Sequence, residues 1–106
     1  MLMVTSKNFT QEVLESEVPV LIDFFATWCM PCKMFAPIVE AVAEEWEGKV
    51  KVVKVDVDEA PDLARKYSVM SIPTIKLVKG DDVLGSFVGA MSLEELEDWI
   101  GEHYGK

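Results

Sequence analysis

The sequence contains few of the residues that would place it in several common protein classes. Only two of its 106 residues are cysteine, too few for the disulfide framework of a small secreted protein. It has 10 basic residues against 19 acidic ones, and its formal net charge is −9 at pH 7. Because Lys and Arg form no cluster, the chain lacks the basic surface that holds a nucleic-acid backbone. We therefore expect no nucleic-acid partner.

Long apolar runs are also missing. No run approaches the length that spans a bilayer, and the first residues lack the basic and apolar regions of a secretory signal. Half of the residues are nonetheless hydrophobic, which is enough to bury one core. We expect a single domain over residues 1–106 that is soluble, monomeric and cytoplasmic, with no membrane partner.

Apolar periodicity divides the first half of the chain into helices and strands. After a short apolar start, a helix capped by Thr5 or Ser6 is predicted. The continuous apolar run over 18–25 predicts a central strand buried on both faces. A helix over 31–46 and a strand over 50–57 follow, and the two strands joined by this helix should be parallel.

The second half of the chain continues this alternation and then departs from it. A short helix is predicted to open near residue 58 and to end near Tyr67. Strands over 72–78 and 83–88 flank a turn and form a hairpin. The order βαβαβαββα predicts an α/β fold, a three-layer α/β/α sandwich around a mixed five-stranded sheet.

The last helix has a clear start. Ser92, with Glu95 three residues later, forms a capping box. The inner stripe of this helix should contain Leu93, Leu96, Trp99 and Ile100. We expect Trp46 and Trp99 to lie in the core, and His103 to be a surface residue in the fraying final turn.

The two cysteines lie where the central strand gives way to a helix. Cys29 and Cys32 are three residues apart, so they share one face of the first helical turn. Exposed amide groups and the helix dipole favour a thiolate at Cys29, and Lys33 adds a positive charge. We expect Cys29 to be the exposed nucleophile and Cys32 to be a less exposed resolving thiol. Pro31 fits the first turn, where its missing N–H costs nothing.

A metal site and a structural disulfide are the alternatives to a redox role for the cysteine pair. A metal site needs about four ligands, which the two cysteines and the distant His103 do not supply within one chain. A structural disulfide between residues so close in sequence would constrain little of the unfolded chain. Redox exchange is the preferred interpretation. We expect no metal and no bound cofactor, since no glycine-rich nucleotide loop is present.

With these motifs in view, the sequence resembles the thioredoxin family over essentially its whole length. The segments 23–34, 53–56, 72–74 and 88–90 each look like part of the family pattern. The resemblance implies a protein-disulfide reductase that carries electrons to other enzymes, with disulfide-containing target proteins and a thioredoxin reductase as partners. No His lies between the cysteines, which favours a reductant over an oxidant.

The sequence departs from the family pattern at three positions. Met30-Pro31 stands where Gly-Pro is commonest, Phe25 where many members carry Trp, and Ser71 where Gly is usual. None of the departures removes a catalytic group. Because Met30 and Ser71 belong to the rim that partners touch, the choice of partner is what they affect.

The resemblance assigns three supporting residues to the dithiol. Asp23, whose lone carboxylate is costly in an apolar strand, would exchange a proton with Cys32, unless it is an ordinary strand-end aspartate. Lys54 would tune Asp23, or would be an exposed strand lysine. Pro73 matches the family's cis-proline, whereas a trans proline opening a strand is the alternative. As a cis-proline it would keep metals from the cysteines and let the backbone of Ile72 pair with a substrate.

The resemblance also implies an apolar rim around Cys29 that contacts substrate polypeptides. The rim would comprise Trp28, Met30, Pro31, Ile72, Gly89 and Ala90. Trp28 could equally be a core aromatic. Two functions of other classes are the alternatives to disulfide reduction. One is an assembly clamp in which the dithiol is incidental, and the other is a metal carrier or metal-bridged dimer.

Overall fold

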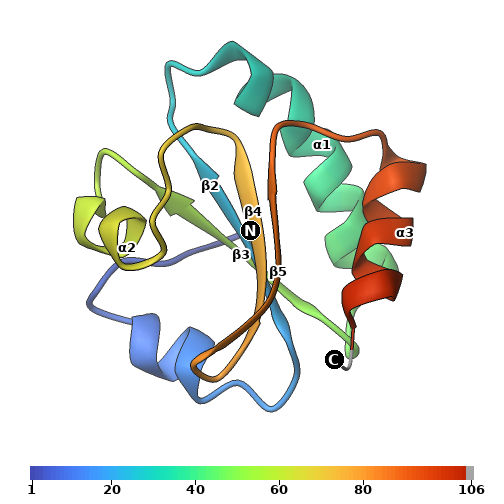
Figure 1. The fold of residues 1–106 in the computed structure, drawn as a ribbon, viewed down its shortest axis with the longest axis horizontal. Coiled ribbons are helices and arrows are strands. Elements are labelled where there is room, and N and C mark those ends of the chain that lie inside the picture. Colours follow the sequence, from blue (N-terminus) through green and yellow to red (C-terminus); the bar gives the residue numbers. More distant parts are fainter. Residues whose placement is uncertain (105–106) are drawn as a thin grey trace.

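The computed structural model describes residues 1–104 and places helices on both faces of one β-sheet (Figure 1). One segment near the N-terminus is a single turn of π-helix, and the remaining helices are α-helices. In chain order the elements are β1 (Leu2–Met3), η1 (Thr10–Leu14), β2 (Val20–Phe25), α1 (Met30–Glu45), β3 (Lys51–Asp56), α2 (Pro61–Lys66), β4 (Thr74–Lys79), β5 (Asp82–Val88) and α3 (Leu93–His103).

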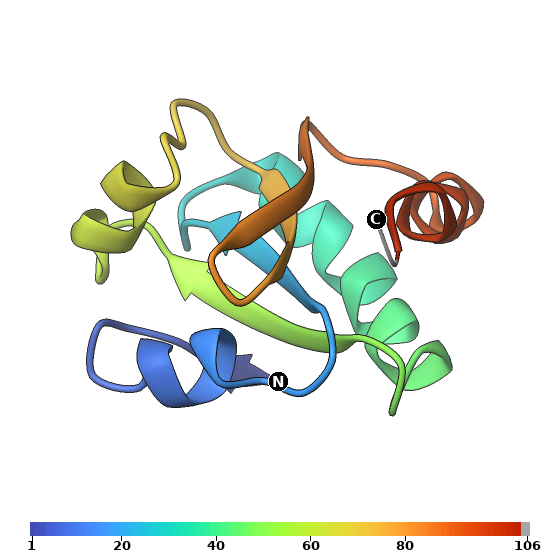
Figure 2. The ribbon, with the colours of Figure 1, turned by 60° about the horizontal axis from the view of Figure 1, so that its bottom comes forward.

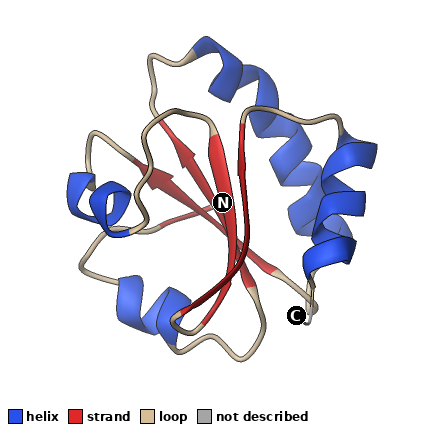
Figure 3. Cartoon of the chain, viewed as in Figure 1, coloured by secondary structure: helices blue, strands red, loops and turns tan. Residues whose placement is uncertain are grey.

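The sheet has five strands in the order β1-β3-β2-β4-β5, so β2 is central (Figure 3). Strand β3 runs parallel to both β1 and β2, whereas β4 runs antiparallel to β2 and to β5. In the middle of β2, Asp23 pairs with Lys54 of β3 and with Ile75 of β4. The predicted α/β sandwich with a mixed five-stranded sheet is confirmed.

Helices cover both faces of this sheet (Figure 2). Helices α1 and α3 lie together on one face, and η1 and α2 lie on the other. Five of the six residues of β2 are buried and the sixth, Phe25, is half-buried. A strand covered on both sides has no polar face, which is why its sequence is a continuous apolar run rather than an alternation.

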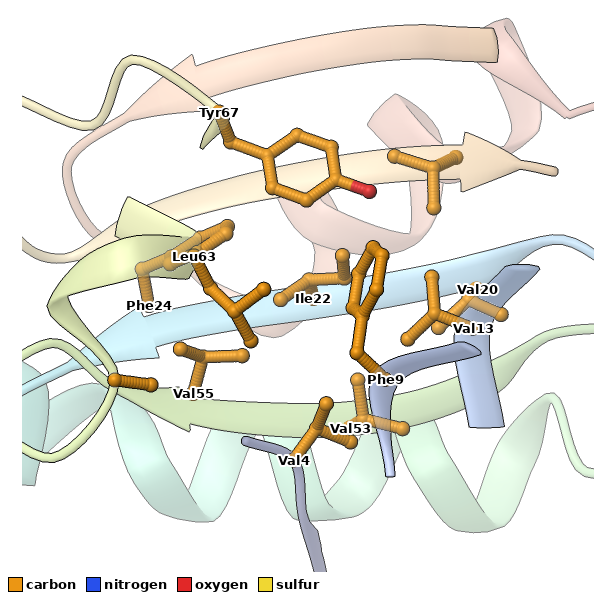
Figure 4. Close-up of a cluster of buried hydrophobic side chains, with 12 residues drawn as sticks. Val4, Phe9, Val13, Val20, Ile22, Phe24, Val53, Val55, Leu63 and Tyr67 are labelled. Atoms are coloured by element: carbon orange, nitrogen blue, oxygen red, sulfur yellow. The ribbon is translucent and has the colours of Figure 1, made fainter. Parts of the chain in front are cut away.

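The core on the η1 and α2 face is built around aromatic rings (Figure 4). The ring of Tyr67 lies 6.0 Å from that of Phe9 and 5.8 Å from that of Phe24, measured between centroids. Burial of such side chains contributes roughly 1.5–3 kcal/mol each. This cluster fixes η1 and α2 against the sheet, and thereby the loops that leave them.

The second core lies between the sheet and the helices α1 and α3. Its largest buried side chains include Phe35, Leu77 and Ile100. The predicted core residues Trp46 and Trp99 are half-buried and pack against this cluster. Leu93 was predicted on the inner stripe of α3, and this prediction is wrong, since the residue is 39% exposed.

The predicted helix starts are confirmed at one end of the chain and wrong at the other. The capping box of α3 is present, with the N–H of Ser92 donating to Glu95 and the N–H of Glu95 donating to Ser92 Oγ. Near the N-terminus, Thr5 does not cap a helix. Its N–H donates to Oδ1 of Asn8, and this contact shapes a turn that precedes η1. The helix therefore starts at Thr10.

His103 was predicted to be a surface residue, and it is half-buried instead. Its Nδ1 atom lies 2.8 Å from the carbonyl oxygen of Trp99, and the two rings stack with 4.6 Å between centroids. Both rings lie close to the backbone of β5 at Gly85. None of the helices in residues 1–104 is long and apolar enough to cross a membrane.

Candidate active site

Cys29 and Cys32 form a disulfide at the start of α1, with 5.3 Å between their Cα atoms. Cys29 is the N-cap residue of the helix, and its Sγ atom accepts a hydrogen bond of 3.2 Å from the N–H of Cys32. Pro31 occupies the first turn, where no intrahelical donor is needed. The helix start therefore directs an N–H donor at the sulfur of Cys29, and such a donor stabilises negative charge there.

The predicted difference in exposure between the two cysteines is wrong for this disulfide form. Cys29 is 4% exposed and Cys32 is 5% exposed. The two residues differ instead in the surface that each one faces. Cys29 lines a large apolar groove, whereas Cys32 lines a smaller pocket next to Lys33 and Lys54. The two cysteines therefore border different surfaces.

The groove at Cys29 has a volume of about 460 Å³. Apart from Ser71, its lining side chains are apolar. The lining consists of Trp28, Cys29, Met30, Pro31, Val57, Ala64, Val69, Met70, Ser71 and Ile72. Among residues 1–104 no charged side chain lines it, so an apolar stretch of polypeptide fits its chemistry.

Four of the six residues predicted for the rim line this groove, and two do not. Gly89 and Ala90 are absent from its lining among the described residues. Gly89 lies just beyond it, where its N–H donates to the carbonyl of Pro73 over 2.8 Å. Contact of Gly89 and Ala90 with substrates stays a prediction.

One wall of the groove, formed by the segment from Val57 to Met70, was not predicted from the sequence. Val57 directly follows β3, and carboxyl ends of neighbouring parallel strands meet at one edge of a sheet, so its place could have been predicted. Met70 is 93% exposed in the loop after α2. Its position depends on how that loop packs back toward Cys29, and no local pattern reports this.

Trp28 is an exposed rim residue rather than a core aromatic, with 68% of its surface accessible. Its indole Nε1–H donates a hydrogen bond of 2.8 Å to Oδ2 of Asp58. Asp58 is held in turn, because its N–H donates to Oδ1 of Asp56 at the end of β3. An exposed aromatic ring is therefore kept in one place beside Cys29.

Pro73 is buried next to the groove, and the Ile72–Pro73 peptide bond is cis, as the resemblance implied. Ile72 lines the groove immediately before β4 begins at Thr74. The hydroxyl of Thr74 donates back to the carbonyl of Ser71, which closes this loop on itself. The loop presents Ile72 on the same surface as Cys29.

Asp23 is an ionisable side chain within the sheet, with only 2% of its surface exposed. Its Oδ1 atom has no hydrogen-bond partner within residues 1–104. Burial raises the pKa of Asp23 from 3.8 to about 6, against the opposing effect of the positive charge on Lys54. A carboxyl with this pKa can both accept and return a proton near neutral pH.

Lys54 lies opposite Asp23 in the parallel pairing of β2 and β3. Its ammonium group is directed over the ring of Phe25, with 4.2 Å from Nζ to the centroid. Phe25, Lys54 and Cys32 all line the smaller pocket, which has a volume of about 240 Å³. The site thus has a positive charge near Cys32 and a buried proton acceptor on the neighbouring strand.

The described residues offer little to a metal ion. Within residues 1–104 no three or more His, Cys, Asp or Glu side chains are grouped so that they could hold one. His103, the histidine weighed as a ligand, lies at the end of α3 and stacks on Trp99.

Comparison with known proteins gives one consistent result. Residues 1–102 match the family model described as Thioredoxin. The chain is 48% identical to Thioredoxin 1 of Nostoc sp. over 100 residues, which cover 94% of each protein. It is 46% identical to Thioredoxin of Rickettsia felis over 99 residues, 93% of this chain and 94% of the relative. Thioredoxin of Porphyra purpurea is 41% identical over 100 residues, again 94% of each.

Proposed function

The chain belongs to the thioredoxin family and is a protein-disulfide reductase, and we propose that Cys29 starts the exchange and that Cys32 completes it. The observation that carries this assignment of roles is the difference in surroundings of the two cysteines. Cys29 caps α1 and faces the apolar groove, whereas Cys32 faces the pocket that contains Lys54.

The first step is attack by the Cys29 thiolate on one sulfur of a disulfide in a target protein. A bond forms between Sγ of Cys29 and that sulfur, the target's S–S bond breaks, and the second target sulfur leaves as a thiolate. The N–H of Cys32 and the start of α1 favour the thiolate form of Cys29 before the attack.

The second step releases the target. Cys32 gives its proton to Asp23 through water and attacks Sγ of Cys29, so the mixed disulfide breaks and the target sulfur bound to Cys29 leaves as a thiolate. The two electrons gained by the target come from the dithiol, which ends as the Cys29–Cys32 disulfide. An external reductase restores the dithiol. The pKa of about 6 for Asp23, its burial and its place on the strand that leads to Cys29 support its role as the proton acceptor.

Targets bind in the groove beside Cys29. The apolar walls suit an extended segment with apolar side chains, and Met30 and Met70 adapt to differing shapes because their thioether chains are flexible. Ile72 stands next to the start of β4, where its backbone can pair with the segment as an added strand. Trp28 contributes a fixed ring on the rim.

The test is a turbidity assay that contains the purified protein, dithiothreitol as reductant, and a disulfide-bonded substrate protein that precipitates once its disulfides are reduced. The chain should accelerate reduction well beyond the rate with dithiothreitol alone. A second arm supplies candidate reductases, each with its own electron donor, in place of dithiothreitol. A rate equal to that of dithiothreitol alone would refute the function.

The protein works as a monomer in the cytoplasm, where glutathione keeps thiols reduced. One chain carries both cysteines and the groove, so the exchange needs no second copy. Size-exclusion chromatography with light scattering tests the oligomeric state, and fractionation of the source cells tests the location.

A further inference from the structure

The side chain of Lys54 has two neighbours that can attract its positive charge, and it contacts one of them. Because the Cα atoms of Asp23 and Lys54 are paired across β2 and β3, their side chains leave the same face of the sheet. The Lys54 ammonium nevertheless lies 4.2 Å from the ring centroid of Phe25. In residues 1–104 no ion pair joins Lys54 to a carboxylate.

We propose that Phe25 is a positioning residue, whose ring holds the Lys54 ammonium beside Cys32 and keeps it out of a direct ion pair with Asp23. The inference rests on the proposed proton transfer from Cys32 to Asp23. It adds a reason why an aromatic side chain stands at the end of β2, which the exchange reaction itself does not explain.

The geometry of β2 places the ring where this role requires it. Phe25 is two residues after Asp23 on the same strand, so both side chains point to one face, and Phe25 is nearer the end of the strand that leads to Cys29. A lysine opposite Asp23 reaches the ring by extending along the sheet toward the active site. Its charge then lies in the pocket that Phe25 and Cys32 also line.

Release of Lys54 from the ring would change the charge that acts on Asp23. Oδ1 of Asp23 is buried without a hydrogen-bond partner in the described part of the chain, so it is an acceptor open to a nearby ammonium group. Another carboxylate on this face of the sheet is that of Asp56 on β3, and its Oδ1 already accepts the N–H of Asp58. Lys33 of α1 lines the pocket and contributes only positive charge.

A direct ion pair would make Asp23 a poorer proton acceptor. An opposite charge in contact favours the ionised carboxylate and lowers its pKa, whereas burial alone raises it. By holding the Lys54 ammonium at the ring, Phe25 keeps the attraction between Lys54 and Asp23 weaker than the effect of burial, in agreement with an Asp23 pKa of about 6. The same position leaves the ammonium next to Cys32, where it favours a thiolate.

The experiment measures the pKa of Asp23 from the carboxyl-carbon chemical shift in the disulfide form of the protein, to which the value of about 6 applies. In Phe25→Leu the ammonium should move to Asp23, and the pKa should fall from about 6 by about 1. The pH midpoint of mixed-disulfide release should move down with it. In Phe25→Trp, which keeps a ring for the cation, both values should stay at those of the parent protein. Phe25→Met, also without a ring, repeats the test if the Leu variant is unstable.

A background without Lys54 separates positioning from packing. In Lys54→Met the pKa of Asp23 should rise, because the attracting charge is gone, and adding Phe25→Leu should then change nothing. An equal fall with and without Lys54 would show that the ring acts by packing, and an unchanged or raised pKa in Phe25→Leu alone would also overturn the proposal. The pKa measurements need only the folded protein, so they stand apart from a failure of the disulfide-reductase assay, whereas the midpoint of mixed-disulfide release depends on it.

Discussion

The imidazole of His103 occupies the space that a side chain at position 85 would need. A Cβ atom on Gly85 would lie 2.6 Å from Cδ2 of His103 and 3.0 Å from Cζ2 of Trp99. The imidazole has little freedom to yield, because Nδ1 contacts the Trp99 carbonyl and the ring stacks on the indole. Because residue 85 of β5 is a glycine, the end of α3 can pack against the sheet at this position.

Gly85→Ala should destabilise the fold. The added methyl group must displace the stacked rings of Trp99 and His103, and overpacking of this kind costs about 1–3 kcal/mol. Urea denaturation followed by circular dichroism measures the loss. The double variant Gly85→Ala, His103→Ala should recover part of it, because it removes the ring that clashes.

Gly101→Ala is the matched control. Gly101 lies in α3, and no atom outside its own helix comes within 4 Å of a Cβ at this position. Since alanine favours a helix over glycine by up to about 1 kcal/mol, this variant should be as stable as the parent chain or more stable. If both alanine variants had the same free energy of unfolding, the packing of His103 on Gly85 would make no contribution to stability.

Cys29→Ser should abolish the reduction of protein disulfides, whereas Cys32→Ser should accumulate mixed disulfides with target proteins. The reason is that Cys29 faces the groove where targets bind and Cys32 does not. Non-reducing electrophoresis and mass spectrometry identify the cysteine that holds the trapped partner. Trapping with equal yield through Cys32 in the Cys29→Ser variant would overturn the assignment of roles.

Asp23→Asn should leave the first attack largely intact and slow release of the mixed disulfide near neutral pH. An amide cannot accept the proton of Cys32, so the second step loses its base. Stopped-flow fluorescence resolves the two steps, since Trp28 stands beside Cys29 in the groove lining. Equal release rates in the variant and the parent protein would remove Asp23 from the mechanism.

Asp23 should also make stability depend on pH. Because burial raises its pKa from 3.8 to about 6, the folded chain keeps a proton across this range that the unfolded chain releases. The contribution of Asp23 to stability therefore falls as pH rises from about 4 to about 6, by about 3 kcal/mol in total, and then stays constant. Asp23→Asn should gain stability relative to the parent by about this amount between about pH 3.5 and pH 8. Urea denaturation of both proteins at the two pH values measures this gain. If the difference in free energy of unfolding between variant and parent were the same at both pH values, the raised pKa would be contradicted.

Met30→Gly should change the use of partners more than the redox potential. The substitution increases the conformational entropy of the backbone, an effect of roughly 0.5–1 kcal/mol in free energy. This corresponds to a change in the redox potential of only about 10–20 mV. The lost side chain lines the groove beside Cys29, where it contacts whatever binds there. The redox equilibrium with glutathione and the kcat/KM with the cognate reductase are the two measurements. Met34→Gln is a suitable control, since Met34 is exposed on α1 outside the groove lining.

A shift in potential well beyond about 30 mV, with unaltered kinetics toward partners, would reverse this conclusion about Met30. Such a result would mean that residue 30 acts on the relative stability of the dithiol and the disulfide rather than on docking.

The fold could be predicted where the sequence pattern is set by burial. The apolar run of β2 indicates a strand covered on both faces, and the capping box at Ser92 marks the start of α3 to within one residue. The first helix could not be placed in this way. Thr5 has the chemistry of a cap, but its Oγ1 accepts the N–H of Lys7 two residues later, and this local contact favours a turn over a helix start.

The site could be predicted as far as it depends on neighbours in the chain. Cys29 and Cys32 lie in one helical turn, and Ile72 is marked by the proline that follows it. The wall at Met70 and the stacking of His103 near Gly85 join segments distant in sequence, so they depend on tertiary packing. The position of the Lys54 ammonium is of the same kind, because the strand pairing alone would place it at Asp23.

The location of the disulfide also determines what a reaction cycle does to the rest of the molecule. Cys29 and Cys32 pack with Ala26 in a small cluster at one end of the sheet, apart from the two large cores. The bond closes a very short loop, and short loops gain the least from a cross-link. The side chains of both cores keep their contacts when the bond breaks, but the unfolded chain loses a constraint worth about 2 kcal/mol. Oxidised molecules should therefore survive proteases and heat longer than reduced ones, so that the form of the protein that has just served a target is also its more durable form.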